Sequence, residues 1–102
     1  MISFVRTASA MPGMAPAAMT FAVKVAAFLK DTYQRDVMVS RPIGGNPYRV
    51  AWSTRFNDLA EMEAFNTKLL ADAKYWELVN SGANYFIAGT AFDEIWQNRA
   101  FY

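Results

Sequence analysis

The sequence of 102 residues contains no cysteine and no histidine. Without cysteine there can be no disulfide bond, and nothing indicates an oxidising compartment. Structural zinc and blue-copper sites lose their usual ligands, and haem loses its commonest ones. Catalytic triads built on histidine are excluded, so any general base must be a carboxylate, a lysine, a tyrosine or the substrate itself. We therefore expect no metal and no cofactor.

Charge is also scarce. Charged residues form 19% of the chain, below the usual share of about 25%, and 10 basic residues nearly balance 9 acidic ones. A nucleic-acid-binding domain usually gathers a basic excess on one face, so we expect no nucleic-acid partner. Hydrophobic residues form 54% of the chain. A small monomer of this composition would expose large apolar patches, which favours an oligomer.

Long hydrophobic runs are missing as well. The segment Ala8-Ser9-Ala10 resembles a signal-peptidase site. However, Arg6 interrupts the short apolar run before it, whereas a secretory hydrophobic region needs roughly 7 to 15 residues. No stretch approaches the about 20 apolar residues of a membrane span. We expect a cytoplasmic protein without a membrane partner.

The hydrophobic pattern predicts strands and helices in a defined order. Strands are expected at 2–10, 37–43, 48–56 and 84–92. Helices are expected from Pro16 to about Tyr33–Arg35, over 58–70 and over 72–79, and an aromatic tail over 93–102. Asp58, followed three residues later by Glu61, is typical of a capping box at the start of a helix. Pro16 suits the first turn of the long helix, where its missing N–H is harmless.

The order β-α-β-β-α-β is that of the ferredoxin-like fold, an α+β domain with a four-stranded antiparallel sheet. Right-handed crossovers place both main helices on one face, with the first and third strands central. We expect a single domain over 1–102, with 95–102 as an aromatic C-terminal arm. The other sheet face then has no cover from its own chain, and a second copy would have to supply it.

The strand at 48–56 shows which side chains would face that second copy, because alternate residues point to opposite faces. Its bulky set, Tyr48, Val50, Trp52, Thr54 and Phe56, is expected to meet the helices. The other set is expected at the dimer interface, together with aromatic residues of the tail that would pack on the partner: Arg49, Ala51, Ser53, Arg55, Trp96, Phe101 and Tyr102.

Two motifs resemble the NIPSNAP family. VRTASAMPGM at 5–14 resembles its strand-to-helix opening, where an Arg-Thr pair precedes a Pro-Gly. LLADAKYWELV at 69–79 resembles the end of its second helix, a Leu-Leu-x-Asp-Pro-x-Trp-like run, with Ala73 in place of the proline. RFNDLAEMEAF lies between them at 55–65, so the similarity touches most of the chain.

The resemblance implies a homodimeric α+β barrel, in which two ferredoxin-like sheets pair face to face. Relatives of such barrels include cofactor-free monooxygenases, haem-degrading enzymes, lactone isomerases, dehydratases and proteins without known activity. The haem-degrading branch needs a helical histidine, which this chain lacks. The monooxygenase branch implies catalytic candidates Asn66, Trp76 and Arg6, for an oxygen anion, a flat substrate and an enolate respectively. Alternatively, Trp76 closes the core and Asn66 only borders the buried stripe.

The arginines leave two interpretations open. They form ion pairs between subunits at the barrel rim, with Asp93 and Glu94 as the available acids, or one faces a pocket and binds a carboxylate or enolate. Arg6 is the best candidate for the second role.

The six methionines either fill the core or line an adaptable cavity. Such a cavity would take an apolar or aromatic carboxylic acid, with ligand-binding residues Arg6, Met14, Trp52, Met62, Asn66, Trp76 and Phe86. A dimer without any ligand is the third hypothesis.

Overall fold

The protein, a computed structural model described here over residues 1–100, has one sheet and one layer of helices. In chain order its elements are β1 (Ile2–Ser9), α1 (Ala15–Tyr33), β2 (Met38–Ser40), β3 (Arg49–Phe56), α2 (Leu59–Leu70), α3 (Ala73–Ser81), a short 3-10 turn (Ala83–Tyr85) and β4 (Phe92–Gln97). The strand order is β2-β3-β1-β4 and every neighbouring pair is antiparallel. The predicted α+β, ferredoxin-like fold is confirmed, with β1 and β3 central.

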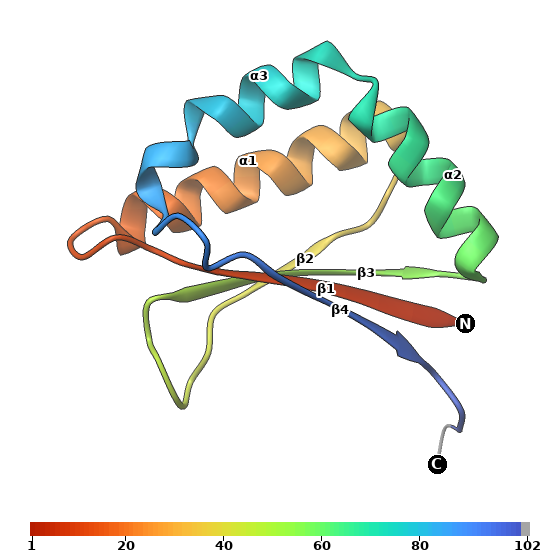
Figure 1. The fold of residues 1–102 in the computed structure, drawn as a ribbon, viewed down its shortest axis with the longest axis horizontal. Coiled ribbons are helices and arrows are strands. Elements are labelled where there is room, and N and C mark those ends of the chain that lie inside the picture. Colours follow the sequence, from red (N-terminus) through yellow and green to blue (C-terminus); the bar gives the residue numbers. More distant parts are fainter. Residues whose placement is uncertain (101–102) are drawn as a thin grey trace.

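All three helices lie on the same side of the sheet (Figure 1). Within the described residues, no helix covers the opposite side, which we call the uncovered face. The long connection between β2 and β3 extends on that uncovered side (Figure 1). The layer arrangement is therefore one-sided, as the sequence order predicted.

The fourth strand was predicted too early in the chain. The segment 84–92 is wrong as a strand: it holds the end of the 3-10 turn, a single bridge between Phe86 and Ala10, and a turn in which Gly89 has a φ of 80°. The strand is instead Phe92–Gln97, the first part of the predicted tail, and it pairs with β1. Because β4 is an edge strand with every residue exposed, it lacks the buried alternation that identifies a strand. Phe101 and Tyr102 lie outside the described residues.

The alternation predicted for β3 is confirmed. Val50 and Phe56 are only 3% exposed on the helix side, while Arg49 and Arg55 are exposed. Trp52 also faces the helices, since its indole N–H donates to the carbonyl of Ala22 on α1 at 3.1 Å. The set at positions 49, 51, 53 and 55 therefore lies on the uncovered face.

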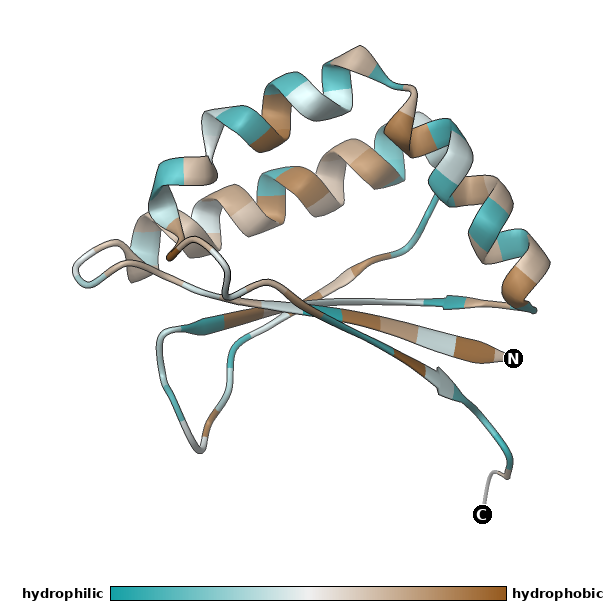
Figure 2. Ribbon diagram, viewed as in Figure 1, coloured by the Kyte–Doolittle hydropathy of each residue, from teal (hydrophilic) through white to brown (hydrophobic). Residues whose placement is uncertain are grey.

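The core forms where α1 rests on the sheet. Its buried residues recur at helical spacing, on the face toward the strands: Ala18, Phe21, Ala22, Val25 and Leu29. Ala18 and Ala22 are fully buried beside Val50, so small side chains let the helix approach β3 closely. Figure 2 shows hydrophobic residues recurring along α1 and β1.

Two aspartates start the later helices. The carboxylate of Asp58 accepts from the backbone N–H of Glu61 at 2.8 Å, and Glu61 accepts from the N–H of Asn57 at 3.0 Å, which confirms the predicted capping box. Asp72 caps α3 by accepting from the backbone N–H of Lys74 at 2.9 Å. The corner between α2 and α3 is thus fixed by side-chain hydrogen bonds, and it directs α3 back along α1 (Figure 1).

Candidate functional site

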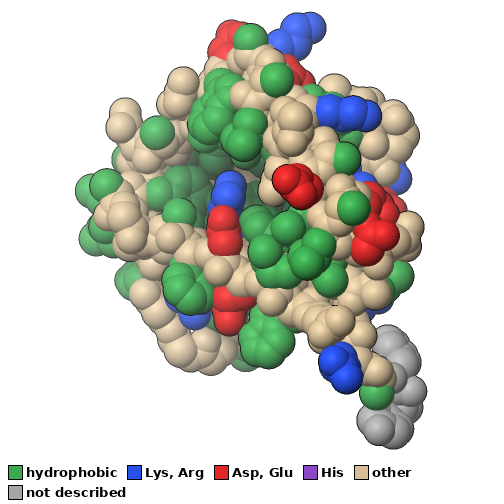
Figure 3. Space-filling model, turned by 45° about the vertical axis from the view of Figure 1, so that its right-hand side comes forward, with side chains coloured by type: hydrophobic (Ala, Val, Ile, Leu, Met, Phe, Trp, Pro, Cys, Tyr) green, Lys and Arg blue, Asp and Glu red, His purple; other side chains and the backbone are tan. Residues whose placement is uncertain are grey.

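A cavity of about 280 Å³ lies between the sheet and the helices. Figure 3 shows its mouth as a hollow lined with hydrophobic side chains, in which a basic side chain lies beside an acidic one. Residues from β1, α1, β3, α2, α3 and the segment before β4 line it, mostly apolar: Phe4, Arg6, Ala8, Phe21, Val25, Leu29, Val37, Trp52, Ser53, Thr54, Phe56, Met62, Phe65, Asn66, Leu69, Tyr75, Val79, Gly82, Ala83, Phe86 and Ala91.

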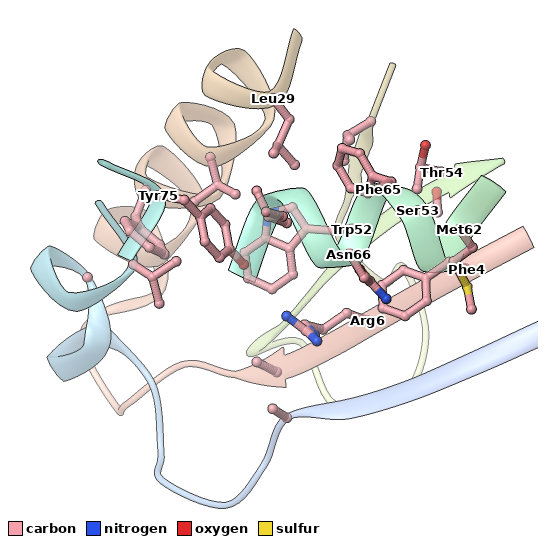
Figure 4. Close-up of a pocket in the computed structure, with 18 of the residues that line it drawn as sticks. Phe4, Arg6, Leu29, Trp52, Ser53, Thr54, Met62, Phe65, Asn66 and Tyr75 are labelled. Atoms are coloured by element: carbon pink, nitrogen blue, oxygen red, sulfur yellow. The ribbon is translucent and has the colours of Figure 1, made fainter. Parts of the chain in front are cut away.

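The cavity exists because the helices do not cover the sheet evenly. α1 packs on β3 and β2, and α2 packs on β3. α3 packs on the other two helices and on the 3-10 turn, so it spans above the sheet. An open space therefore remains above β1, and large side chains from both the sheet and the helices point into it (Figure 4). The α2–α3 corner at Asp72 therefore sets the height of the cavity roof.

Arg6 supplies the charge in this cavity. Its Nε and Nη2 atoms donate to the two carboxylate oxygens of Asp93 at 2.7 and 2.9 Å, across the β1–β4 pair. The two side chains are 43% and 42% exposed, so the pair sits at the mouth. The hydrogen bonds that Arg6 donates to Asp93 raise the pKa of Arg6 above its ordinary value, whereas burial lowers it. The guanidinium is therefore held charged and in a fixed orientation.

Four further polar residues border the cavity. Asn66 reaches it from α2, and Ser53 and Thr54 from β3. Tyr75 of α3 is buried, and it lies close enough to Arg6 to contribute to the raised pKa of that residue. Figure 4 shows Arg6 and Asn66 on the same side of the cavity, with the ring of Trp52 between Arg6 and α1. The arrangement offers an apolar volume with hydrogen-bond donors gathered at one end.

The structure brings together five of the seven residues predicted to bind a ligand: Arg6, Trp52, Met62, Asn66 and Phe86 all line the cavity. Met14 and Trp76 do not line it. Met14 precedes α1 and is exposed. Trp76 is 42% exposed, and its indole N–H donates to the carbonyl of Leu70 at 2.9 Å, which turns the ring away from the sheet. Of the three catalytic candidates, Arg6 and Asn66 therefore share the cavity and Trp76 lies outside it.

Sequence reasoning missed Tyr75 and Gly82. It named Asp93 as an acidic partner of the arginines but between subunits, whereas the structure pairs Asp93 with Arg6 within one chain. Tyr75 could have been found, because Tyr75, Leu78 and Val79 follow the spacing of a buried helical stripe and Trp76 falls beside it. Gly82 closes one end of the cavity against Phe21 and has no local signal for that role. The Arg6–Asp93 pair depends on the register of β4, which the sequence pattern placed wrongly.

The five residues predicted at a dimer interface that the structure describes lie on the uncovered face. Trp96 stands opposite Ser3, and Ser3 stands opposite Arg55, so the three form one row across the sheet. Ala51 and Ser53 lie in neighbouring rows, opposite Thr7 and Val5, and Arg49 stands opposite Ser9 at the start of β3. Ser53 also borders the cavity. Phe92 and Trp96 of this face are exposed in the single chain.

In residues 1–100 there is no group of three or more acidic side chains that could hold a metal ion. Over the same residues, no helix combines the length and apolar character needed to cross a membrane.

The sequence matches no protein-family model and no curated protein. Solved structures do match. An uncharacterized NIPSNAP domain protein from Burkholderia xenovorans superposes with a TM-score of 0.84 at 16% identity, over 99% of this chain and 97% of that chain. The chain shares the NIPSNAP fold. A NIPSNAP family protein with unknown function from Agrobacterium tumefaciens str. C58 gives a TM-score of 0.82 at 16% identity, over 100% and 91%. The NIPSNAP resemblance seen in the sequence motifs is thus confirmed at the level of the fold.

A second group of matches has a different description. A "putative antibiotic biosynthesis monooxygenase" from Deinococcus radiodurans superposes with a TM-score of 0.71 at 15% identity, over 100% of this chain and 96% of that chain. At such identities the likeness to either group concerns the fold alone. The residues that line the cavity are therefore the basis for any function of this chain.

Proposed function

We propose that the protein binds a small apolar or aromatic molecule in the cavity between its sheet and its helices. One observation carries the proposal: a space of about 280 Å³ lined mostly by apolar side chains, with Arg6 and Asn66 at one end. Binding sites for small molecules typically combine an apolar wall with a few convergent polar groups. An engineered apolar cavity of about 150 Å³ binds benzene, so this one has room for a two-ring aromatic molecule.

Blocking the mouth of the cavity tests this function. Ala91 lines the cavity yet is exposed, so Ala91→Trp would fill the mouth without disturbing the core. Ala88→Trp is the matched control, because Ala88 is exposed in the same segment and does not line the cavity. With a naphthyl methyl ketone as probe, calorimetry should give equal affinity for the wild type and Ala88→Trp, and at least tenfold weaker binding for Ala91→Trp. A wild type that binds nothing, or an Ala91→Trp variant that binds normally, would contradict the proposal.

We also propose that two copies pair through their uncovered faces to form a barrel. Support comes from the exposed aromatic residues of β4, Phe92 and Trp96, and from the small residues Ala51 and Ser53 on β3, which allow close approach. A large exposed apolar surface is unusual for a monomer.

The dimer is tested by placing charge at the centre of that face. Ala51→Arg should shift the protein to a monomer in sedimentation equilibrium, because it adds a buried, unpaired cation to each sheet. Ala64→Arg makes the same change on an exposed position of α2, on the other side of the molecule, and should leave the dimer intact. If Ala51→Arg sediments as the wild type does, the uncovered face is not the interface.

An enzyme is the second candidate function: a cofactor-independent monooxygenase or isomerase acting on an enolisable polycyclic ketone. The observation that favours it is that Arg6 and Asn66 border one cavity, where both could donate hydrogen bonds to an oxygen anion that develops on the substrate. Oxygen consumption with such a ketone should disappear in Asn66→Ala. It should persist in Asn80→Ala, which changes an exposed asparagine of α3. Activity that survives Asn66→Ala would exclude this mechanism.

A further inference from the structure

The polar end of the cavity is an ion pair and not a free cation. Both carboxylate oxygens of Asp93 accept from the guanidinium of Arg6, so the two charges neutralise one another. Among the described residues that line the cavity, Arg6 is the only one with a formal charge. Asp93 does not line the cavity and lies behind Arg6 on the edge strand β4. A ligand in the cavity therefore meets donors whose positive charge is already balanced.

The guanidinium still has donors to offer. It carries five N–H groups, of which Asp93 takes one from Nε and one from Nη2. Three remain, two of them on Nη1, and Tyr75, which contributes to the raised pKa of Arg6, can occupy at most one of them. A carbonyl or phenolic oxygen could accept from these groups while the bidentate pair with Asp93 stays intact.

A carboxylate ligand would meet a different situation. It would add a second negative charge beside Asp93, opposite a single guanidinium, in a space with apolar walls. The remaining N–H groups of Arg6 could still donate to such a ligand, but burying a charge without its own counter-charge is costly. A neutral oxygen group carries no such cost.

We propose that Asp93 makes the cavity select neutral aromatic ketones or phenols over carboxylic acids. This inference rests on the proposed binding function, and it replaces the carboxylic acid expected from the sequence. Asp93 acts as a specificity-determining residue through Arg6, without itself forming a wall of the cavity.

The neighbouring residue on β4 provides the matched control. Asp93 stands opposite Arg6 and points to the helix side, whereas Glu94 stands opposite Val5 and points to the uncovered face. Asp93→Asn and Glu94→Gln therefore remove the same charge, one residue apart, on opposite sides of the sheet. Both side chains are exposed, so neither change is expected to prevent folding.

The experiment compares two probes of nearly the same shape at pH 7, a naphthyl methyl ketone and naphthoate, by calorimetry on three proteins. The wild type and Glu94→Gln should bind the ketone at least tenfold more tightly than naphthoate. Asp93→Asn should reduce this preference at least tenfold, through tighter binding of naphthoate, with the affinity for the ketone changed less than threefold.

The outcomes separate the inference from the function on which it rests. If none of the three proteins binds either probe, the proposed binding function fails. If the wild type binds both probes equally, or if Asp93→Asn keeps the wild-type preference, binding stands and the role of Asp93 is overturned. The wild-type comparison needs no variant, so equal binding of the two probes would overturn the inference even where Asp93→Asn does not fold.

Discussion

The ring of Phe21 lies directly against the backbone of Gly82. A Cβ atom on Gly82 would stand 2.3 Å from ring carbons Cδ1 and Cε1 of Phe21, closer than real Cβ contacts allow. Phe21 is buried and makes edge-to-face contacts with Tyr85 and Phe86, at centroid distances of 6.1 and 5.9 Å. These neighbours restrict where the ring can move. Since Phe21 and Gly82 both line the cavity, this contact also shapes the binding space.

Gly82→Ala should therefore destabilise the protein by about 1–3 kcal/mol, the usual range for overpacking a core. It should also weaken binding of an aromatic probe, because the displaced ring takes part of the cavity. Urea unfolding and calorimetry measure the two effects. Gly44→Ala is the control, since an added Cβ meets no atom within 4 Å there. Equal stability of the two variants would show that the ring of Phe21 can move aside without a loss of folding free energy.

Stability should fall in acid because of Asp72. The hydroxyl of Tyr33 donates to Asp72 at 2.6 Å, and this bond, followed by the N–H groups of Tyr75 and Lys74, holds the pKa of Asp72 below its ordinary value. The carboxylate thus binds its proton less tightly in the folded state than in the unfolded chain. The resulting stabilisation is fully present above the ordinary carboxyl pKa of about 4 and is lost as the pH falls through the lower folded value.

Urea unfolding between pH 7 and 2 measures this effect. Tyr33→Phe keeps the aromatic contacts with Phe28 and Phe65 but removes the hydroxyl, so the acid loss of stability should be smaller than in the wild type. Glu61 contributes in the same direction, since the N–H of Asn57 and then the guanidinium of Arg35 lower its pKa. The prediction fails if Tyr33→Phe has the same pH dependence as the wild type.

The start of α2 should depend on the carboxylate of Asp58. Asp58→Ala removes the acceptor for the N–H of Glu61 and should cost about 1 kcal/mol in the free energy of unfolding. Asp58→Asn keeps an acceptor oxygen and should restore most of that stability. A loss of equal size in both variants would assign the effect to charge and not to the cap.

Ile43 should strengthen the proposed dimer. It lies in the β2–β3 connection, on the uncovered side of the sheet, and its relative exposure of 108% leaves it without cover from its own chain. Ile43→Ser should weaken dimerisation in sedimentation without changing the unfolding of the monomer. Leu70→Ser, at an exposed position of α2 on the helix side, should leave the dimer unchanged. The loop has no role in assembly if both variants behave alike.

Local signals made most of the fold predictable. The helix starts at Pro16 and Asp58, and the alternation along β3, each follow from a few adjacent residues and are all found. β4 was missed because an edge strand exposed on both faces shows no buried alternation. The segment before it contains Tyr85 and Phe86, which look like strand residues, yet they pack on Phe21 beside a 3-10 turn.

An apolar cavity that contains an arginine was predictable from the sequence, but some of the residues that line it were not. Trp52 was identified from the strand parity of 48–56, and Arg6 and Asn66 from the family resemblance. Tyr75 and Trp76 are adjacent, and the direction of α3 decides which of them faces inward. That direction is set at the α2–α3 corner by Asp72, through a bond to Tyr33 from a distant part of the chain. No local pattern contains that information.

The position of Asp93 on β4 also has a consequence for motion. Within the described residues, β4 has one neighbour in the sheet, β1, and all its side chains are exposed. Backbone hydrogen bonds at such an edge open more readily than those of central strands. Each opening of β4 carries Asp93 away from Arg6, so the charge balance of the cavity and its access from solvent change in one event.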